Sequence, residues 1–329
     1  MGGGPSTPEL AAAVTGAGGL GFLAAGYKST EELAAEIAAT RELTDRFGVN
    51  LFVPGPRSDP RRYGSYVAAL QEDAGGSEVG EPRWSDDEWD AKLELLRREP
   101  VAVVSFAFGC PPAEVLGSVT ETGAEAWVTV TTPEEARQAA AAGAGALVVQ
   151  GHEAGAHQGT FDDESAGEAL GLLALLQLVK ATTDLPLVAS GGIATGAGVA
   201  AALAAGASAV QIGTAFLLCP EAGTSEPHRR ALLRGGTTEI TRAFTGRRAR
   251  GIVNRFLRDH RDAPSAYPEV HYATAPIRAA ARERGDGEEL NLWAGQAYEL
   301  AREEPAAAVV ARLGAEARQA LEAALRADS

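Results

Sequence analysis

The feature that most constrains the fold of this chain is an alternation of short apolar runs with segments of helical character. The alternation is regular from about residue 100 onwards. Apolar runs at 101–108, 125–131 and 146–150 alternate with helical segments at 113–122, 133–142 and 166–182. Strands and helices at this spacing form βαβ units, which place the strands parallel in one sheet. The chain is therefore predicted to be an α/β protein.

The number of predicted strands favours a closed barrel. Four more apolar runs lie at 19–23, 47–53, 186–193 and 209–216, and the first helix (6–15) has no strand before it. Eight βα units close a (β/α)8 TIM barrel, whereas a doubly wound sheet, the alternative that we keep, usually has fewer units. We therefore expect a (β/α)8 barrel whose first strand is truncated and lies upstream of Met1.

The regular alternation ends near Pro220, and two further regions follow it. Residues 220–288 have the pattern of short helices around the basic stretch 242–250, and we expect a small helical lid inserted after the eighth strand. Residues 289–329, with helical segments at 291–302 and 304–327, are expected to return to the barrel wall. The predicted domains are thus a barrel over 1–219, a lid over 220–288 and C-terminal helices over 289–329.

Composition and charge exclude several classes of function. The net charge of −15, from 44 acidic and 29 basic residues, opposes binding to the phosphate backbone of a nucleic acid. No run of eighteen apolar residues is present, so we expect no membrane span. Cys110 and Cys219 are too few for a disulfide framework or a zinc site, which favours a reducing, cytoplasmic location.

A polar, glycine-rich loop follows the apolar run at 146–150 and carries the most reactive side chains. Residues 150–159 read QGHEAGAHQG, with His152, Glu153 and His157 close together and no bulky apolar residue. Loops of this kind, at the end of a buried strand, carry the chemistry of α/β enzymes. We interpret His152 as structural or solvated and Glu153 as a residue that orients the loop by hydrogen bonds.

Two later strand ends form a second group of candidate residues. The run at 186–193 ends in Gly191-Gly192, and the run at 209–216 contains Gly213-Thr214. Both offer backbone N–H groups with little side-chain bulk. Because the loops after the last two strands of a (β/α)8 barrel often bind phosphate, the pair predicts a phosphate site.

Six motifs, taken in chain order, resemble those of the nitronate monooxygenases, FMN-dependent barrel enzymes once called 2-nitropropane dioxygenases. They lie at 6–10, 17–23, 48–54, 150–159, 189–193 and 211–214, with further matches at 250–255 and 294–296. The resemblance covers nearly the whole chain. One departure is that the family loop usually has two glycines before its histidine, where this chain has Gly155-Ala156. Alanine is harmless there if φ is negative and strained if φ is positive.

The resemblance implies an FMN cofactor, and it implies that His157 is the catalytic histidine. His157 would take the proton next to a nitro group or, when protonated, hold the charge of a nitronate. The substrates would be a small nitronate and O2, and the products a carbonyl compound and nitrite. The residues expected to contact FMN, including the predicted phosphate site, are Asn50, Gln150, Gly155, Gly191, Gly192, Gln211, Ile212, Gly213 and Thr214.

Two other functions stay open, as does a homodimeric assembly. One is a flavin-dependent enoyl-acyl-carrier-protein reductase, a related barrel that needs a nicotinamide. The other is a flavin-binding protein without turnover. Among the remaining charged residues, we interpret Arg247, Arg248 and Arg250 as a solvent-exposed face, and Asp162-Asp163 as loop or helix-cap acids rather than a metal pair.

Overall fold

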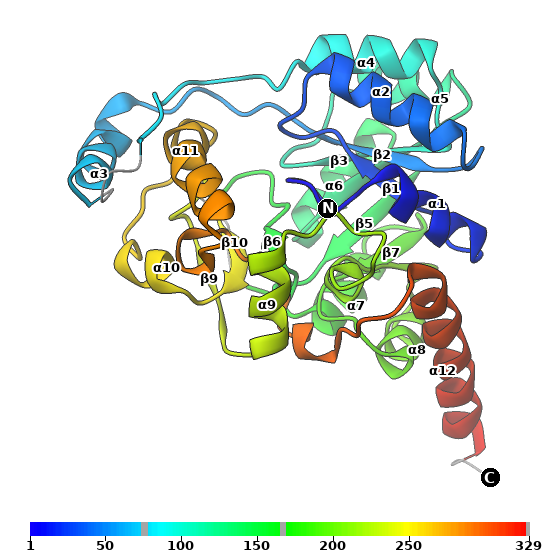
Figure 1. Cartoon of the computed structure of the whole chain (residues 1–329). Coiled ribbons are helices and arrows are strands. Elements are labelled where there is room, and N and C mark those ends of the chain that lie inside the picture. Colours follow the sequence, from blue (N-terminus) through cyan, green and yellow to red (C-terminus); the bar gives the residue numbers. More distant parts are fainter. Residues whose placement is uncertain (74–77, 165–168, 327–329) are drawn as a thin grey trace.

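In the computed structural model, which describes residues 1–73, 78–164 and 169–326, parallel strands form one curled sheet (Figure 1). The order of its seven strands is β1-β2-β3-β4-β5-β7-β8, so β1 and β8 form its edges. The bounds are β1 (Phe22–Ala24), β2 (Gly48–Phe52), β3 (Val103–Ala107), β4 (Glu125–Val130), β5 (Ala146–Gln150), β7 (Leu187–Ser190) and β8 (Ala209–Gln211). Each matches a predicted strand, and the sheet is that of a (β/α)8 barrel. The strand expected before the first helix stays a prediction.

Helices cover the outer face of this sheet (Figure 1). They are α1 (Pro8–Gly16), α2 (Thr30–Arg41), α4 (Trp89–Arg98), α5 (Ala113–Thr120), α6 (Pro133–Ala142), α7 (Leu172–Lys180), α8 (Gly196–Ala204) and α12 (Ala306–Arg326). Side-chain hydroxyls of Thr7, Ser29, Thr132 and Thr195 cap four of them. The core lies between the helices and the sheet, where side chains such as Leu147 and Leu175 are fully buried.

The region after β8 contains strands as well as helices. Its elements are η1 (Thr214–Phe216), α9 (Glu226–Arg234), β9 (Thr238–Thr241), β10 (Ala249–Ile252), α10 (Arg255–Asp259), α11 (Glu269–Arg284), η2 (Gly287–Glu289) and η3 (Tyr298–Leu300). A second sheet has the strand order β6-β10-β9. Its strand β6 (Ala156–His157) has two residues and belongs to the glycine-rich loop. The expectation of helices alone was therefore wrong, because β9 and β10 have four residues each, Thr-Glu-Ile-Thr and Ala-Arg-Gly-Ile, and are too short for an apolar alternation to stand out. The helix expected over 291–302 is reduced to the short turn η3.

One helix from the range 1–219 packs against residues of the range 220–288, for which we keep the name lid. The helix α3 (Pro60–Asp73) lies apart from the sheet, near α10 and α11 (Figure 1). Its Leu70 packs in a cluster with Phe244, Phe256 and Ile277, and Tyr66 Oη donates a hydrogen bond of 2.7 Å to Ala243 O. Two stretches far apart in the sequence thus build the lid side of the molecule. No helix in the described residues is long and apolar enough to cross a membrane.

Candidate functional site

The carboxyl ends of the strands open into a cavity of about 1210 Å³. Parallel strands in register bring their last residues together: Gln150 lies opposite Ser190, and Ser190 lies opposite Gln211. Every site residue named from the sequence lines this cavity. These residues are Asn50, Gln150, Gly155, His157, Gly191, Gly192, Gln211, Ile212, Gly213 and Thr214.

The side chain of Gln150 closes the glycine-rich loop on itself. Its Nε2 donates to His157 O at 3.1 Å, and its Oε1 accepts from Gly159 N at 2.7 Å. The carbonyl oxygen and one amide hydrogen of Gln150 are therefore engaged within the protein. Among the residues that the structure describes, the other amide hydrogen has no partner and is left for a ligand. Gln150 thus shapes the loop, a role that the sequence analysis did not assign to it.

The residue before the histidine is strained. Ala156 has φ of +62°, in the left-handed region that L-residues other than glycine avoid. It pairs with Arg250 in the β6–β10 ladder, and this pairing fixes its backbone. Because φ is positive, the alanine that replaces the family's second glycine is strained and not harmless.

Position 155, just before Ala156, requires glycine because the segment 294–296 approaches it closely. A Cβ on Gly155 would lie 2.4 Å from Gly295 N, closer than any side chain allows. Gly295 N donates to Thr214 Oγ1 at 3.1 Å, and Gln296 N donates to Glu153 O at 3.0 Å. The segment 294–296 thus ties the glycine-rich loop to the end of β8.

Glu153 orients the loop, as the sequence predicted. Both of its carboxylate oxygens accept from Leu172 N at 3.0 Å, at the first residue of α7. A carboxylate at this place also interacts favourably with the helix dipole. His152 contributes its backbone carbonyl, which accepts from Arg250 Nη2 at 2.9 Å.

The ends of β7 and β8 have the features of an anion site. Gly191 and Gly192 have φ of +109° and +68°, which only glycine adopts readily. Within the described residues, the backbone N–H groups of Gly192 and Gly213 make no hydrogen bond, although both residues line the cavity. Unbonded backbone donors on two adjacent strand ends fit the phosphate group of FMN.

Asn50, at the other side of the cavity, keeps a free donor. Ser105 Oγ donates to Asn50 Oδ1 at 2.8 Å, which fixes the amide orientation. Its NH2 group has no partner among the described residues and is left for a ligand. Together with the strand-end N–H groups, this amide makes the cavity suitable for a flavin with a single phosphate.

Aromatic rings surround His157. Ring centroids of Phe108, Trp293 and Tyr267 lie 5.5, 5.6 and 5.9 Å from that of the imidazole. On its polar side, His157 Nε2 lies 2.9 Å from Thr245 Oγ1. The imidazole is thus held in an apolar wall of the cavity by one hydroxyl.

Electrostatics keep this imidazole neutral. Burial, and after it the charge of Arg247, lowers the pKa of His157 from 6.5 to about 3, although Asp163 opposes the shift. At pH 7 the ring therefore carries a lone pair on one nitrogen and no charge. A neutral imidazole accepts a proton, but it does not hold the charge of an anion.

The arginines interpreted as a solvent-exposed face are in large part buried, so that interpretation was wrong. Arg247 and Arg250 are 7% and 3% exposed. The Arg247 guanidinium lies 4.1 Å from the Phe108 ring centroid, and it donates to Gln158 O at 3.4 Å and to Thr160 O. Backbone carbonyls of the loop take up these donors, a long-range pairing that no local sequence pattern reveals.

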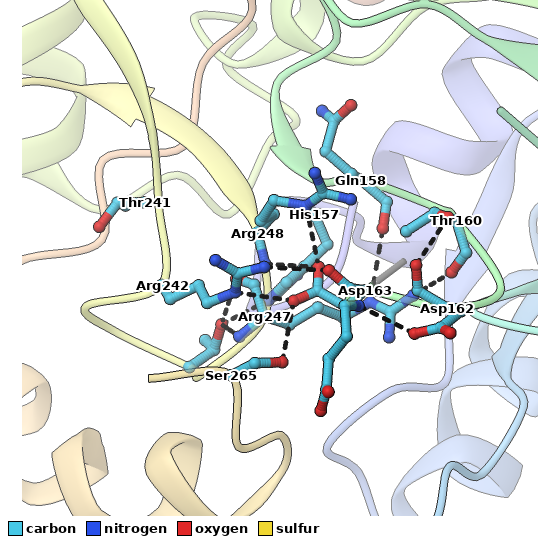
Figure 2. Close-up of polar contacts among 12 residues, drawn as sticks. His157, Gln158, Thr160, Asp162, Asp163, Thr241, Arg242, Arg247, Arg248 and Ser265 are labelled. Carbon is cyan, nitrogen blue, oxygen red and sulfur yellow. Dashed lines mark hydrogen bonds and ion pairs between the residues drawn. The ribbon is translucent and has the colours of Figure 1, made fainter. Parts of the chain in front are cut away.

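Figure 2 shows that Asp163 connects the loop after His157 to the lid. Its Oδ2 accepts from Arg242 Nε at 2.8 Å and from Ser265 Oγ at 3.2 Å. Its Oδ1 accepts from Arg248 N at 3.1 Å and from Arg248 Nε at 3.3 Å. Asp163 is only 8% exposed, so its role exceeds that of the loop acid expected from the sequence.

A second carboxylate anchors the same loop to the barrel. Glu135 Oε1, on α6, accepts from Thr160 Oγ1 at 2.9 Å and from Phe161 N at 2.7 Å. Glu135 Oε2 accepts from Thr131 N at 2.6 Å. Residues 160–163, which follow His157 in the sequence, are therefore held between the barrel and the lid.

Sequence reasoning missed Thr245 and the aromatic residues around the imidazole. Thr245 lies inside the basic stretch 242–250, where arginines dominate the pattern, and the match at 250–255 begins after it. Phe108 closes a predicted strand, and its φ of +76° is a signal that only the structure provides. Within the described parts of the chain, no group of three or more His, Cys, Asp or Glu residues could hold a metal ion.

Comparison with known proteins gives a consistent result. A family model described as nitronate monooxygenase matches residues 1–316. A nitronate monooxygenase from Pseudomonas aeruginosa is 43% identical, over 96% of this chain and 94% of the relative. One from Paraburkholderia phytofirmans is 39% identical, over 97% and 91%.

Solved structures agree in fold. A nitroalkane oxidase from Streptomyces ansochromogenes is 50% identical, with a TM-score of 0.95 over 98% of this chain and 95% of that chain. FabK from Thermotoga maritima is 28% identical, with a TM-score of 0.79 over 99% and 93%.

Proposed function

Because this chain belongs to the nitronate monooxygenase family, we propose that His157 is its catalytic base and that the strand ends around the cavity hold the FMN. The chain is an FMN-dependent enzyme that oxidises nitronates. The proposal assigns this reaction to individual residues. It is supported by the cavity, which brings the imidazole and the unbonded backbone donors together.

The FMN phosphate is assigned to the N–H groups of Gly192 and Gly213, with Gly191 beside them. Asn50 would donate its free amide to the flavin, and Gly155, Gln150, Gln211, Ile212 and Thr214 complete the wall. When bound, FMN supplies the redox chemistry, accepting electrons from the substrate and passing them to O2. The side chains around it bind, orient and exclude water.

His157 would act on neutral nitroalkanes. A neutral imidazole accepts the proton from the carbon next to the nitro group, which converts the substrate to a nitronate. Burial lowers the pKa of His157 to about 3, so the imidazole is a weaker base than in water. A nitronate that arrives already ionised does not need this step.

The buried, positively charged side chain of Arg278 supports the proposal that the substrate is an anion. Arg278 lines the cavity, is 8% exposed and donates to His271 O at 2.8 Å and to Thr274 Oγ1 at 3.2 Å. No carboxylate within the described residues pairs with it. The charge of Arg278, and not that of His157, would attract the nitronate.

The enoyl reductase alternative receives less support. FabK shares 28% identity with this chain, against 50% for the nitroalkane oxidase, and its TM-score is also lower. We further propose O2 as the oxidant. A homodimer and a cytoplasmic location stay predictions, which size measurement in solution and localisation in the cell would check.

The substitution His157→Asn tests the assignment. We expect the variant to retain FMN but to lose turnover of neutral nitroalkanes by about 10²–10⁴-fold, the usual cost of removing a general base. Turnover of the pre-ionised nitronate should fall much less. Equal activity of variant and parent on the neutral substrate would remove His157 from the mechanism.

A further inference from the structure

The side chain of His157 makes one hydrogen bond within the described residues, to Thr245. Nε2 lies 2.9 Å from Thr245 Oγ1. The same hydroxyl lies 3.2 Å from Arg247 O and 3.4 Å from Arg247 N. A hydroxyl has one hydrogen, which it donates either to Arg247 O or to Nε2. This choice decides which nitrogen of the imidazole carries the proton.

Counting donors and acceptors selects one arrangement. Arg247 is buried, and in the described part of the chain its carbonyl oxygen accepts from no donor except Thr245. If Thr245 donated to Nε2, this buried carbonyl would lose its partner, which is costly. If Thr245 donates to Arg247 O, then Nε2–H donates to Thr245 Oγ1, and Arg247 O, the Thr245 hydroxyl and Nε2 all keep a partner.

We propose that Thr245 is a positioning residue that keeps the proton of His157 on Nε2 and so leaves the Nδ1 lone pair as the base. This inference rests on the proposed role of His157. Nδ1 has no hydrogen-bond partner among the described residues, and His157 and Thr245 both line the cavity. In the transfer, Nδ1 takes the proton from the substrate carbon, the electron pair of the broken C–H bond stays on the nitronate, and the imidazolium keeps its bond to Thr245.

The turn that carries Thr245 is fixed at both ends by one carboxylate. Asp163 holds Arg242 and Arg248, each three residues from Thr245 (Figure 2). Gly246 N donates to Arg242 O at 2.8 Å and closes the turn. The charged groups near the imidazole are Arg247 and Arg278, which oppose a second proton on the ring, and Asp163, which favours it.

The tautomer itself is the first test. We would record ¹⁵N NMR spectra of histidine-labelled, FMN-loaded protein, with the His157→Asn variant identifying the signals of His157. We expect a protonated Nε2 and an unprotonated Nδ1. A proton on Nδ1 in the parent protein would overturn the proposal regardless of any activity measurement.

The second test compares three variants of the hairpin. Thr245→Val removes the hydroxyl, and Thr245→Ser keeps it. Thr241→Val is the matched control, since Thr241 is a buried threonine of the same hairpin whose hydroxyl accepts from Ala243 N at 3.0 Å. We expect Thr245→Val to lower kcat/KM on a neutral nitroalkane about tenfold or more, because the wrong tautomer is known to disable a histidine base.

Turnover of the pre-ionised nitronate by Thr245→Val should stay close to that of the parent, and Thr245→Ser and Thr241→Val should retain activity on both substrates. Parent-like activity of Thr245→Val on the neutral substrate, with His157→Asn impaired, would contradict the role of Thr245 alone. Parent-like activity of both variants would contradict the base role of His157 itself.

Discussion

At the scale of single residues, the molecule accepts local strain next to its proposed catalytic histidine. Ala156 occupies a left-handed conformation that glycine would adopt freely, and β6 holds it there through its pairing with β10. Strain of this kind persists where the surrounding structure fixes the backbone. The sequence indicated the position, because Ala156 replaces a glycine of the family motif. Only the structure gives the sign of φ.

The substitution Ala156→Gly should therefore stabilise the protein. Relief of the positive φ exceeds the entropy that glycine adds to the unfolded chain, for a net gain of up to about 1 kcal/mol. The free energy of unfolding in denaturant measures it. Ala154→Gly is the control, since Ala154 is buried at 4% exposure, has no positive φ and should lose stability on becoming glycine. Equal losses at both positions would show that Ala156 is not strained.

At the scale of elements, the loop of residues 158–163, which follows His157, connects the barrel to the lid. Glu135 holds it on the barrel side, and Asp163 holds it on the lid side. The strands and helices of the barrel were predictable, because each carries a local period of apolar residues. The strands β9 and β10 were not, because each has only four residues. The pairing of β10 with the two-residue strand β6 joins residues about ninety positions apart in the sequence, so the composition of β10 does not reveal it.

The substitution Asp163→Asn should weaken this coupling. Loss of the carboxylate charge leaves Arg242 and Arg248 with weaker partners, for a loss of about 1–3 kcal/mol in stability. Turnover of neutral nitroalkanes should fall as well, because the turn carrying Thr245 loosens. Glu304→Gln is the matched control: Glu304 pairs with Arg312, and neither residue lines the cavity, so this variant should lose stability and keep its activity. Full activity of Asp163→Asn would refute the coupling.

At the scale of the whole molecule, buried histidines make stability depend on pH. Burial lowers the pKa of His157 to about 3 and that of His228 to about 4, and it lowers the pKa of His271 well below 6.5. In the unfolded chain these groups titrate near 6.5, so between these values the unfolded state binds more protons. Stability should therefore fall as pH falls below about 6.5, by up to about 1.4 kcal/mol per pH unit for each group.

Denaturant unfolding at pH 5, 6 and 7 with saturating FMN would measure this dependence. The window lies above the ordinary pKa of carboxylates, so the histidines dominate the change. A free energy of unfolding that is the same at pH 5 and pH 7 would mean that these imidazoles are solvated in the native protein.

The barrel and its cavity follow from the sequence pattern, and the family follows from the order of the motifs. The placement of α3 beside the lid does not, because its buried Leu70 belongs to a cluster that forms only when distant segments fold together. The partners of the buried Arg247 could not be predicted either, since they are the backbone carbonyls of Gln158 and Thr160.

The most direct test of the central claim is oxygen uptake by the purified, FMN-loaded protein supplied with an alkyl nitronate. We predict oxygen consumption with release of nitrite, without any requirement for a nicotinamide. Absence of oxygen uptake on nitronates despite stoichiometric FMN, combined with NADPH oxidation on an enoyl thioester, would contradict the account.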